Sequence, residues 1–112
     1  ACTTLRIGGF STGDFESFNL AERVPDDPKL VRKNRKLLKQ KLVLPKNPLW
    51  LTQTHSTIVV DATNSANKDA EADASFSHKA KWICAVLPAY CLPILTCNTT
   101  QTTAADLTAV CA

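Results

Sequence analysis

Methionine is absent from this sequence of 112 residues, and glycine occurs at only three positions, all within the first thirteen. Because the chain begins at Ala1, we expect that it is not a complete translation product. The first residues lack a basic segment followed by a long apolar one, so we expect no signal peptide. The glycines predict a strand, a tight turn and a loop over residues 6–15, without the spacing of a nucleotide-binding loop.

Long hydrophobic runs are also missing, since the longest, residues 82–95, is interrupted by Pro88 and Pro93. Prolines break a membrane-spanning helix and this run is too short for one, so we expect a soluble, cytoplasmic protein with no membrane partner. The formal charge of +3 is too small to indicate a nucleic-acid partner. With 45% hydrophobic and 21% charged residues, the chain is typical of one small globular domain, residues 1–112.

One helix is predicted clearly, with Asp27 as its N-cap and Pro28 at its first position, and it ends before Pro45. Eight of the thirteen basic residues fall between Lys29 and Lys46. Such a face is either a contact surface for phosphate or nucleic acid, or a solvated helix face. We favour the solvated face, because no aromatic residues alternate with the charges. The predicted buried positions are Leu30, Val31, Leu37, Leu38 and Leu42.

The remainder of the chain is rich in β-forming residues and in turn residues. Two apolar segments, residues 82–87 and 92–97, are predicted as buried strands that separate at Pro88. We also predict one or two strands within residues 49–61, a loop over residues 64–73, a short strand at residues 74–76, a polar turn at residues 99–103, and a last strand or short helix within residues 104–112.

Cysteine occurs five times, so disulfide bonds within one chain cannot pair every thiol. Cys84 and Cys97 lie in apolar segments and are predicted to be buried free thiols of a reducing compartment. Cys91 lies between Pro88 and Pro93, where strand pairing breaks and a site can form. The alternative for one of these thiols is a role as metal ligand or nucleophile.

The two histidines differ in their surroundings. His55 lies within a strand-like run, where a lone histidine is usually structural, and His78 lies in a polar loop where we expect it to be exposed. Imidazole and thiolate are both ligands of zinc and copper, so His55 and Cys91 are the pair best suited to a metal ion. Two ligands are one fewer than a catalytic zinc site takes.

Five segments, in order along the chain, resemble one bacterial family: ACTTLRIGGFSTGDFESFNL, VPDDPKLVRKNRKLL, LWLTQTHSTIVV, EADASFS and ICAVLPAYCLPILTCN. They are similar to its amino-terminal strand, its Asp-Asp-Pro helix start with an Asn-Arg pair, its Trp-Leu-x-Gln-x-His strand, its Ala-Asp-Ala segment and its Ala-Asp-Cys-Leu-Pro strand pair. This is the family of purine nucleoside phosphorylase and adenosine deaminase proteins, also called laccase-domain or multicopper polyphenol oxidase proteins. The resemblance covers about nine-tenths of the chain.

The resemblance implies an α+β fold with mixed β-sheets and flanking helices, of which this chain is about half of the full domain. It implies zinc, with copper as the alternative, held by two histidines and one cysteine. His55 matches the first histidine and Cys91 matches the cysteine, so both are implied to be catalytic. Arg35 matches the arginine of the helix motif and is implied to contact substrate or phosphate. Asn19 and Gln53 match positions at the edge of the pocket.

The implied activity is phosphorolysis of adenosine, inosine and methylthioadenosine, with deamination of adenosine. The implied partners are therefore a purine nucleoside and phosphate, and the oligomeric state is not predicted. Three alternatives stay open: polyphenol oxidation, editing of peptidoglycan precursors, and an inactive truncated domain. An ungapped alignment places Thr108 where the family has its third metal ligand, a histidine, and Tyr90 where the family has the Asp before its cysteine.

Overall fold

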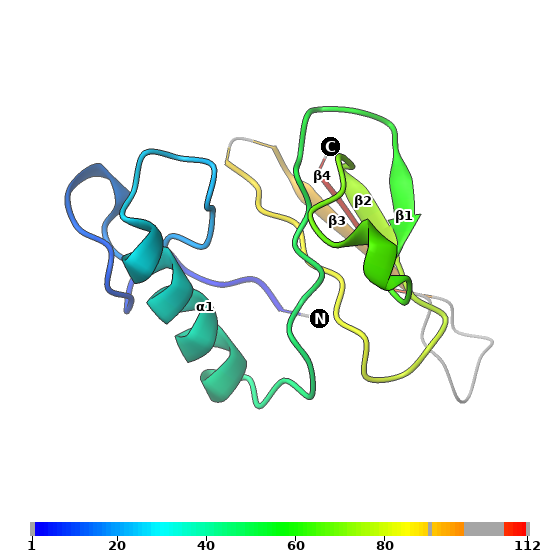
Figure 1. Cartoon of the computed structure of the whole chain (residues 1–112), viewed down its shortest axis with the longest axis horizontal. Coiled ribbons are helices and arrows are strands. Elements are labelled where there is room, and N and C mark those ends of the chain that lie inside the picture. Colours follow the sequence, from blue (N-terminus) through cyan, green and yellow to red (C-terminus); the bar gives the residue numbers. More distant parts are fainter. Residues whose placement is uncertain (1, 90, 98–106, 112) are drawn as a thin grey trace. The chain divides into compact units, whose positions relative to one another are not determined.

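The computed structural model describes residues 2–89, 91–97 and 107–111, and the chain divides into two compact units, Ala1–Leu44 and Pro45–Ala112. The first unit contains a helix and the long loop that precedes it, drawn in blue and cyan in Figure 1. The second contains a four-stranded sheet with its connecting segments, drawn from green to red. A helix together with a sheet of mixed strand directions confirms the predicted α+β class.

Helix α1 (Pro28–Lys41) begins where the sequence predicts it. The Asp27 carboxylate accepts a hydrogen bond of 2.8 Å from the Lys29 N–H, and Pro28 occupies the first turn, where its missing N–H leaves no bond unmade. Lys39 and Lys41 lie in the last turn, where positive charge is favourable at the negative end of the helix dipole. No helix in the described part of the chain is long and apolar enough to cross a membrane.

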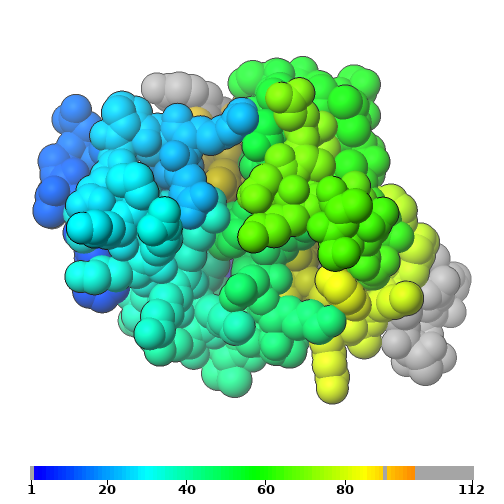
Figure 2. All heavy atoms as spheres, viewed as in Figure 1, coloured from blue at the N-terminus to red at the C-terminus, as the bar shows by residue number. Residues whose placement is uncertain are grey.

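One face of α1 packs against the preceding loop, and this face is not wholly apolar. Val31 and Leu38 are buried as predicted, and Asn34 lies between them with none of its surface exposed. Leu42 is 42% exposed, contrary to the prediction, because it caps the helix beyond its last turn. Figure 2 shows long side chains standing out from the part of the surface that α1 forms, in cyan.

The loop before α1 folds back on itself instead of forming the predicted strand. Ser11 and Ser17 form a single antiparallel bridge around the 3₁₀ turn η1 (Gly13–Phe15), and the described part of this loop contains no strand. The Arg6 Nε donates a hydrogen bond of 2.9 Å to the Glu16 carbonyl, which closes the loop further. The N–H groups of Ser17 and Phe18 also donate to the Arg6 carbonyl, at 2.9 Å and 2.7 Å, so a few backbone bonds and side-chain bonds stand in place of the predicted strand ladder.

The sheet of the second unit runs in the order β1-β2-β4-β3. β1 (Val59–Asp61) pairs in parallel with β2 (Ala74–Phe76), and β4 (Leu107–Cys111) pairs antiparallel with both β2 and β3 (Pro93–Cys97). β2 has the predicted bounds, and the other strands lie within predicted segments. The predicted loop before β2 contains the 3₁₀ turn η2 (Ser65–Asn67). The predicted turn at residues 99–103 lies outside the described residues.

Two segments that were predicted as strands are mostly irregular. Before β1, Leu49 and Thr52 form only isolated bridges, and Cys84 pairs with Leu49 in a single bridge rather than within a strand. Leu49 and Cys84 instead belong to a packed cluster, in which Ala62 and Cys84 are buried and Leu49 and Val86 pack against them. Here tertiary packing overrides the β-propensity of the segment.

The prediction that residues 92–97 are buried is wrong. Leu92 is 74% exposed, and Ile94 and Leu95 are 43% and 39% exposed. β3 is an edge of the described sheet and pairs with β4 alone, so one side of the strand has no neighbouring strand. The Cys97 thiol is consequently exposed rather than buried.

Candidate functional site

His55 lies in a turn and not in the strand that its sequence surroundings predict. Its φ of 60° falls in the left-handed region, which residues other than glycine seldom adopt. The strand prediction is wrong because the N–H groups of this segment bond to a side chain instead of to a neighbouring strand. The side chain of His55 is exposed, so the turn presents an imidazole to solvent.

A buried carboxylate holds this turn. Asp73 is 4% exposed and accepts hydrogen bonds from three successive N–H groups, those of Thr54 at 3.2 Å, His55 at 3.0 Å and Ser56 at 2.6 Å. It also accepts the Ser56 hydroxyl at 2.7 Å. Burial raises the pKa of Asp73, but the hydrogen bonds led by those from Ser56 outweigh burial and hold the pKa below its ordinary value of 3.8. The buried charge is therefore kept and fully partnered.

Gln53 links the segment that carries His55 to the segment that leads to Cys91. Its Oε1 accepts a hydrogen bond of 2.7 Å from the Leu87 N–H. Cys91 follows that segment as a free, half-buried thiol, just before β3 begins at Pro93. The two segments thus lie side by side at Gln53 and Leu87. The pairing of His55 with Cys91 itself stays a prediction.

The donors present fit a zinc or copper ion in kind, because imidazole and thiolate bind both ions well. In number they fall short, since no three His, Cys, Asp or Glu side chains of the described residues lie close enough to hold a metal ion. Thr108 lies in β4, and a threonine hydroxyl is not among the usual ligands of zinc. His55 and Cys91 therefore stay predicted ligands.

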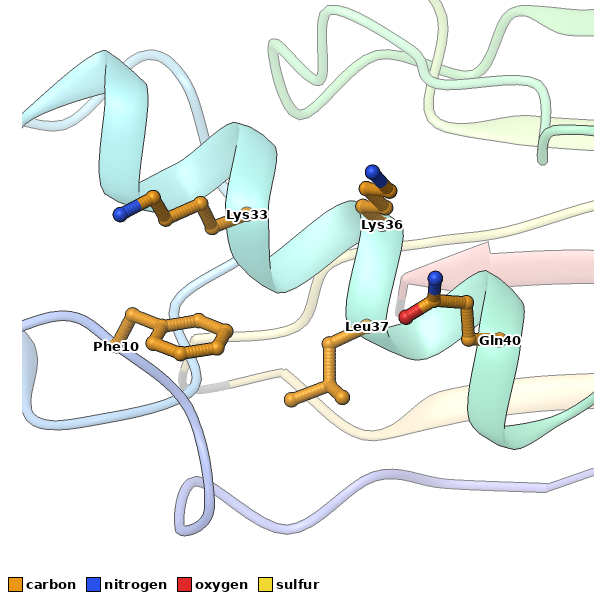
Figure 3. A pocket seen from close by; sticks show the side chains of 5 residues that line it. All are labelled: Phe10, Lys33, Lys36, Leu37 and Gln40. Atoms are coloured by element: carbon orange, nitrogen blue, oxygen red, sulfur yellow. The ribbon is translucent and has the colours of Figure 1, made fainter.

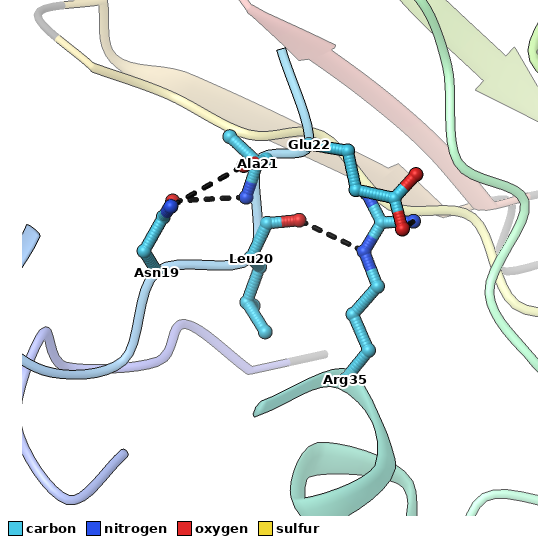
Figure 4. Close-up of polar contacts among 5 residues, drawn as sticks. All are labelled: Asn19, Leu20, Ala21, Glu22 and Arg35. Atoms are coloured by element: carbon cyan, nitrogen blue, oxygen red, sulfur yellow. Dashed lines mark hydrogen bonds and ion pairs between the residues drawn. The ribbon is translucent and has the colours of Figure 1, made fainter. Parts of the chain in front are cut away.

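Arg35 and Asn19 belong to the first unit, whereas His55, Gln53 and Cys91 belong to the second. Figure 4 shows the Arg35 guanidinium beside the loop that precedes α1. Its Nε donates to the Leu20 carbonyl at 2.9 Å, and its Nη1 forms an ion pair with Glu22 at 3.3 Å. Arg35 therefore fastens the loop to the helix, and its contact with substrate stays a prediction.

Asn19 also makes contacts within this loop (Figure 4). Its Nδ2 donates to the Ala21 carbonyl at 3.2 Å and to the Asp26 carboxylate at 2.9 Å, while its Oδ1 accepts from the Ala21 N–H at 2.9 Å. The amide is thus used at both ends to shape the turn. Its predicted place at the edge of a substrate pocket is not tested by these contacts.

Sequence reasoning missed the role of Asn34, whose side chain connects α1 to four residues of the preceding loop. Its Oδ1 accepts from the Phe10 N–H at 2.7 Å, and its Nδ2 donates to the Ser11 hydroxyl at 2.9 Å. The same nitrogen donates to the carbonyls of Ser17 at 3.2 Å and Asn19 at 2.8 Å. All its polar atoms are partnered, which is what a fully buried amide requires.

A shallow pocket of about 320 Å³ lies beside α1, lined by Phe10, Lys33, Lys36, Leu37 and Gln40. Figure 3 shows the Phe10 ring and the Leu37 side chain on the same side of the helix. The Lys33 Nζ lies 5.8 Å from the centroid of the Phe10 ring, within range of a cation–π attraction. None of the predicted site residues lines this pocket, so it is not part of the candidate site.

Comparison with known proteins identifies the class. A sequence model of the family described as "Multi-copper polyphenol oxidoreductase laccase" matches residues 1–109. The chain belongs to this laccase-like family, as its five ordered segments imply. A crystal structure of a Neisseria meningitidis protein, 40% identical in sequence, matches with a TM-score of 0.84. The match covers 96% of this chain and 42% of that protein. The structure of YlmD from Geobacillus stearothermophilus, 24% identical, has a TM-score of 0.82, which shows the fold alone.

The curated relatives carry a common name. The purine nucleoside phosphorylase YfiH of Escherichia coli (strain K12) is 42% identical over 98 residues, which are 88% of this chain and 40% of that protein. The purine nucleoside phosphorylase of Haemophilus influenzae is 44% identical over 95 residues, which are 85% of this chain and 38% of that protein. The chain thus spans about two fifths of the length of the curated relatives that it matches.

Proposed function

We propose that this chain carries part of the catalytic site of a purine nucleoside phosphorylase that also deaminates adenosine. The proposed substrates are adenosine, inosine and methylthioadenosine. The observation that carries the proposal is the exposed His55 on a turn fastened by Asp73, with the segment before Cys91 joined through Gln53 to the segment that carries His55. The names of the Escherichia coli and Haemophilus influenzae relatives support it.

His55 and Cys91 are the proposed ligands of a zinc ion, with copper as the alternative. Such an ion supplies Lewis acidity when bound, which lowers the pKa of a nearby water and so assists deamination. Cys91 must lose its proton and His55 must be neutral to bind, so ion binding should weaken as the pH falls. With two ligands instead of three, we expect the affinity of this chain for zinc to be low.

Phosphorolysis joins a phosphate oxygen to ribose C1′ while the bond from C1′ to the purine nitrogen breaks. The base leaves with the bonding electrons and takes up a proton. The phosphate needs positive charge and several hydrogen-bond donors, which a guanidinium provides. Arg35 is the proposed contact, and phosphate would then compete with Glu22, whose side chain is 43% exposed. Asn19 and Gln53 are proposed to contact the substrate through their amides.

The test is an assay of the 112-residue chain with adenosine or inosine and phosphate, in the presence of zinc, copper or a chelator. We expect free base from both nucleosides, and inosine from adenosine, with metal only. His55→Ala and Cys91→Ser should remove both activities. His78→Ala is the matched control, because His78 is exposed and its ring packs edge-on against Phe76 at 5.0 Å. If neither free base nor inosine forms under any metal condition, the proposal is contradicted.

Oxidation of phenols is a second candidate, favoured by the description of the matching family as a laccase. Copper oxidases of that kind use several ions with many histidine ligands, and this chain has two histidines. We therefore rank it below the nucleoside chemistry. Oxidation of a phenolic dye at stoichiometric copper, lost in His55→Ala, would reverse this ranking, whereas an uncoloured dye would reject the candidate.

A further inference from the structure

The loop that carries His55 is closed at both ends by backbone hydrogen bonds. At its start, the Thr52 carbonyl accepts from the Ala72 N–H at 3.2 Å. At its end, the Ile58 carbonyl accepts from the N–H groups of Asp73 and Ala74 at 3.2 Å and 3.3 Å. Both closing points adjoin Asp73 along the chain, so the backbone of Asp73 is fixed relative to the two ends of the loop.

Between these two points, the side chain of Asp73 accepts the hydrogen bonds that groups of the loop donate. Three successive N–H groups and one hydroxyl donate to its two oxygens. Successive N–H groups aimed at one anion form a concave anion-binding arrangement, and here the anion is a buried side chain of the same chain. An asparagine could not replace it, because an amide has one acceptor oxygen and would turn its NH₂ group toward other donors.

His55 is the middle residue of the three, and its φ of 60° needs support from its surroundings. Asp73 provides that support on both sides, because it accepts from the N–H of His55 and from the N–H of Ser56. These two N–H groups belong to the two peptide planes that flank the His55 Cα. With both planes held, the direction in which the imidazole leaves the backbone is also held.

The geometry points to Asp73 as a positioning residue that holds the His55 turn ready for an ion. Its carboxylate is committed to the turn and acts through His55, without contact with substrate. This inference rests on the proposed function, which makes His55 a metal ligand. A ligand held in place loses less freedom on binding, so removal of the carboxylate should weaken zinc binding without changing the ligands.

The experiment compares wild type with Asp73→Asn and with the matched control Asp61→Asn. The Asp61 carboxylate lies in the same unit but accepts the N–H and the hydroxyl of Thr63, both at 2.8 Å. Hydrogen exchange without metal reports on the amides of residues 54–56, and titration calorimetry with zinc gives the Kd. In Asp73→Asn we expect exchange there to speed up about tenfold or more. We expect the Kd for zinc to rise about 10- to 100-fold.

Asp61→Asn should change neither quantity. The Ala62 amide, which donates to the Phe76 carbonyl at 2.8 Å, should stay protected in every variant and so reports that the sheet is intact. A second pair covers the case in which Asp73→Asn does not fold. Ser56→Ala keeps the three N–H donors to Asp73 and removes the hydroxyl, which donates to Asp73 and accepts from the Ile58 N–H at 3.3 Å. It should shift both readouts in the same direction by less, and Ser56→Thr should restore them.

The outcomes separate this inference from the proposed function. Faster exchange at residues 54–56 with an unchanged Kd for zinc overturns the positioning role and leaves the proposed function standing. Unchanged exchange in both Asp73→Asn and Ser56→Ala overturns it as well. A wild-type chain that binds no zinc removes the proposed metal site and this inference together.

Discussion

The side-chain oxygen of Asn34 accepts a hydrogen bond of 2.7 Å from the backbone N–H of Phe10, which lies 24 residues earlier in the chain. The nitrogen of the same amide donates to the Ser11 hydroxyl and to the carbonyls of Ser17 and Asn19. One fully buried side chain on α1 thus holds the preceding loop on both sides of the turn η1, at residues 10–11 and at residues 17–19. The Ser17 carbonyl also accepts from the Ser11 N–H, and the Ser11 hydroxyl also donates to Asp26, so Asn34 adds to these bonds and is the hydrogen-bond partner of the Phe10 N–H and the Asn19 carbonyl.

We predict that Asn34→Ala lowers the free energy of unfolding by about 2–4 kcal/mol, because four hydrogen bonds to a fully buried side chain are lost and a small cavity is left in their place. The measurement is urea unfolding followed by circular dichroism. Gln40→Ala is the matched control, since it removes an exposed amide from the same helix, and it should change stability by less than about 0.5 kcal/mol. Equal effects of the two substitutions would show that the Asn34 bonds contribute nothing net.

Gly9 allows the loop to approach α1 closely. A Cβ at this position would lie 2.6 Å from the Phe18 Cα and 2.7 Å from the Asn34 Oδ1, and it would also collide with the Ser17 carbonyl. We therefore predict that Gly9→Ala destabilises the chain by at least about 2 kcal/mol, because backbone must move.

Gly8→Ala separates this collision from backbone strain. Gly8 has a φ of 90°, but a Cβ added to it would meet no atom within 4 Å. Gly8→Ala therefore introduces backbone strain alone, which should lower the free energy of unfolding by about 1–2 kcal/mol. Thermal unfolding of both variants gives the comparison. A smaller loss for Gly9→Ala than for Gly8→Ala would contradict the close approach.

The helix could be predicted because its signals are local. Asp27, Pro28 and the basic last turn lie within or beside the segment that they define. Asn34 could have been found by the same pattern, since it stands between Val31 and Leu38 at helical spacing. A polar residue in an apolar stripe indicates a buried side chain with partners, although its partners cannot be named from spacing.

The site could be predicted only in part. His55 and Cys91 are predicted ligands through the resemblance of their segments to the family, and this assignment stays a prediction, whereas the turn at His55 does not follow from the resemblance. That turn depends on Asp73, which lies 18 residues later and bonds to backbone N–H groups that any residue carries. The exposure of Cys97 was missed for a similar reason, because an apolar run looks the same on an edge strand as on a buried one.

Asp26 makes the first unit sensitive to acid. Its carboxylate accepts from the Ser11 hydroxyl at 2.6 Å, the Asn19 amide at 2.9 Å and the Asp27 N–H at 2.8 Å. These bonds, with that from Ser11 the strongest influence, hold the pKa of Asp26 below 3.8 although burial raises it. Because the pKa is lower in the folded state, the carboxylate stabilises the fold above the unfolded pKa, and this contribution is lost as the pH falls through the folded pKa.

We therefore predict that the stability difference between wild type and Asp26→Asn shrinks as the pH falls past 3.8. Urea unfolding at a series of pH values measures it. Asp14→Asn, at an exposed carboxyl of the same loop, is the control and should change the free energy of unfolding by less than about 0.5 kcal/mol. A difference for Asp26→Asn that is independent of pH would mean that its hydrogen bonds do not favour the ionised form.

Exposure and acidity predict the order in which the thiols react with an alkylating reagent. Burial, aided by the negative charge of Asp61, raises the pKa of the Cys84 thiol, so Cys84 should react slowly with or without metal. Cys2 and Cys97 are exposed and should react readily in both conditions. Mapping of the modified sites by mass spectrometry gives the order, and rapid labelling of Cys84 in the folded chain would contradict its burial.

Cys91 is the thiol whose reactivity should depend on metal. It is half-buried and free, so it should react at an intermediate rate in the presence of a chelator. If His55 and Cys91 share a zinc ion, the bound thiolate is no longer available as a nucleophile, and labelling should slow as zinc is added. His55→Ala should remove this protection, whereas His78→Ala should leave it intact. Equal labelling of Cys91 with zinc and with chelator, at zinc concentrations that saturate any binding seen by calorimetry, would show that Cys91 is not a ligand in this chain.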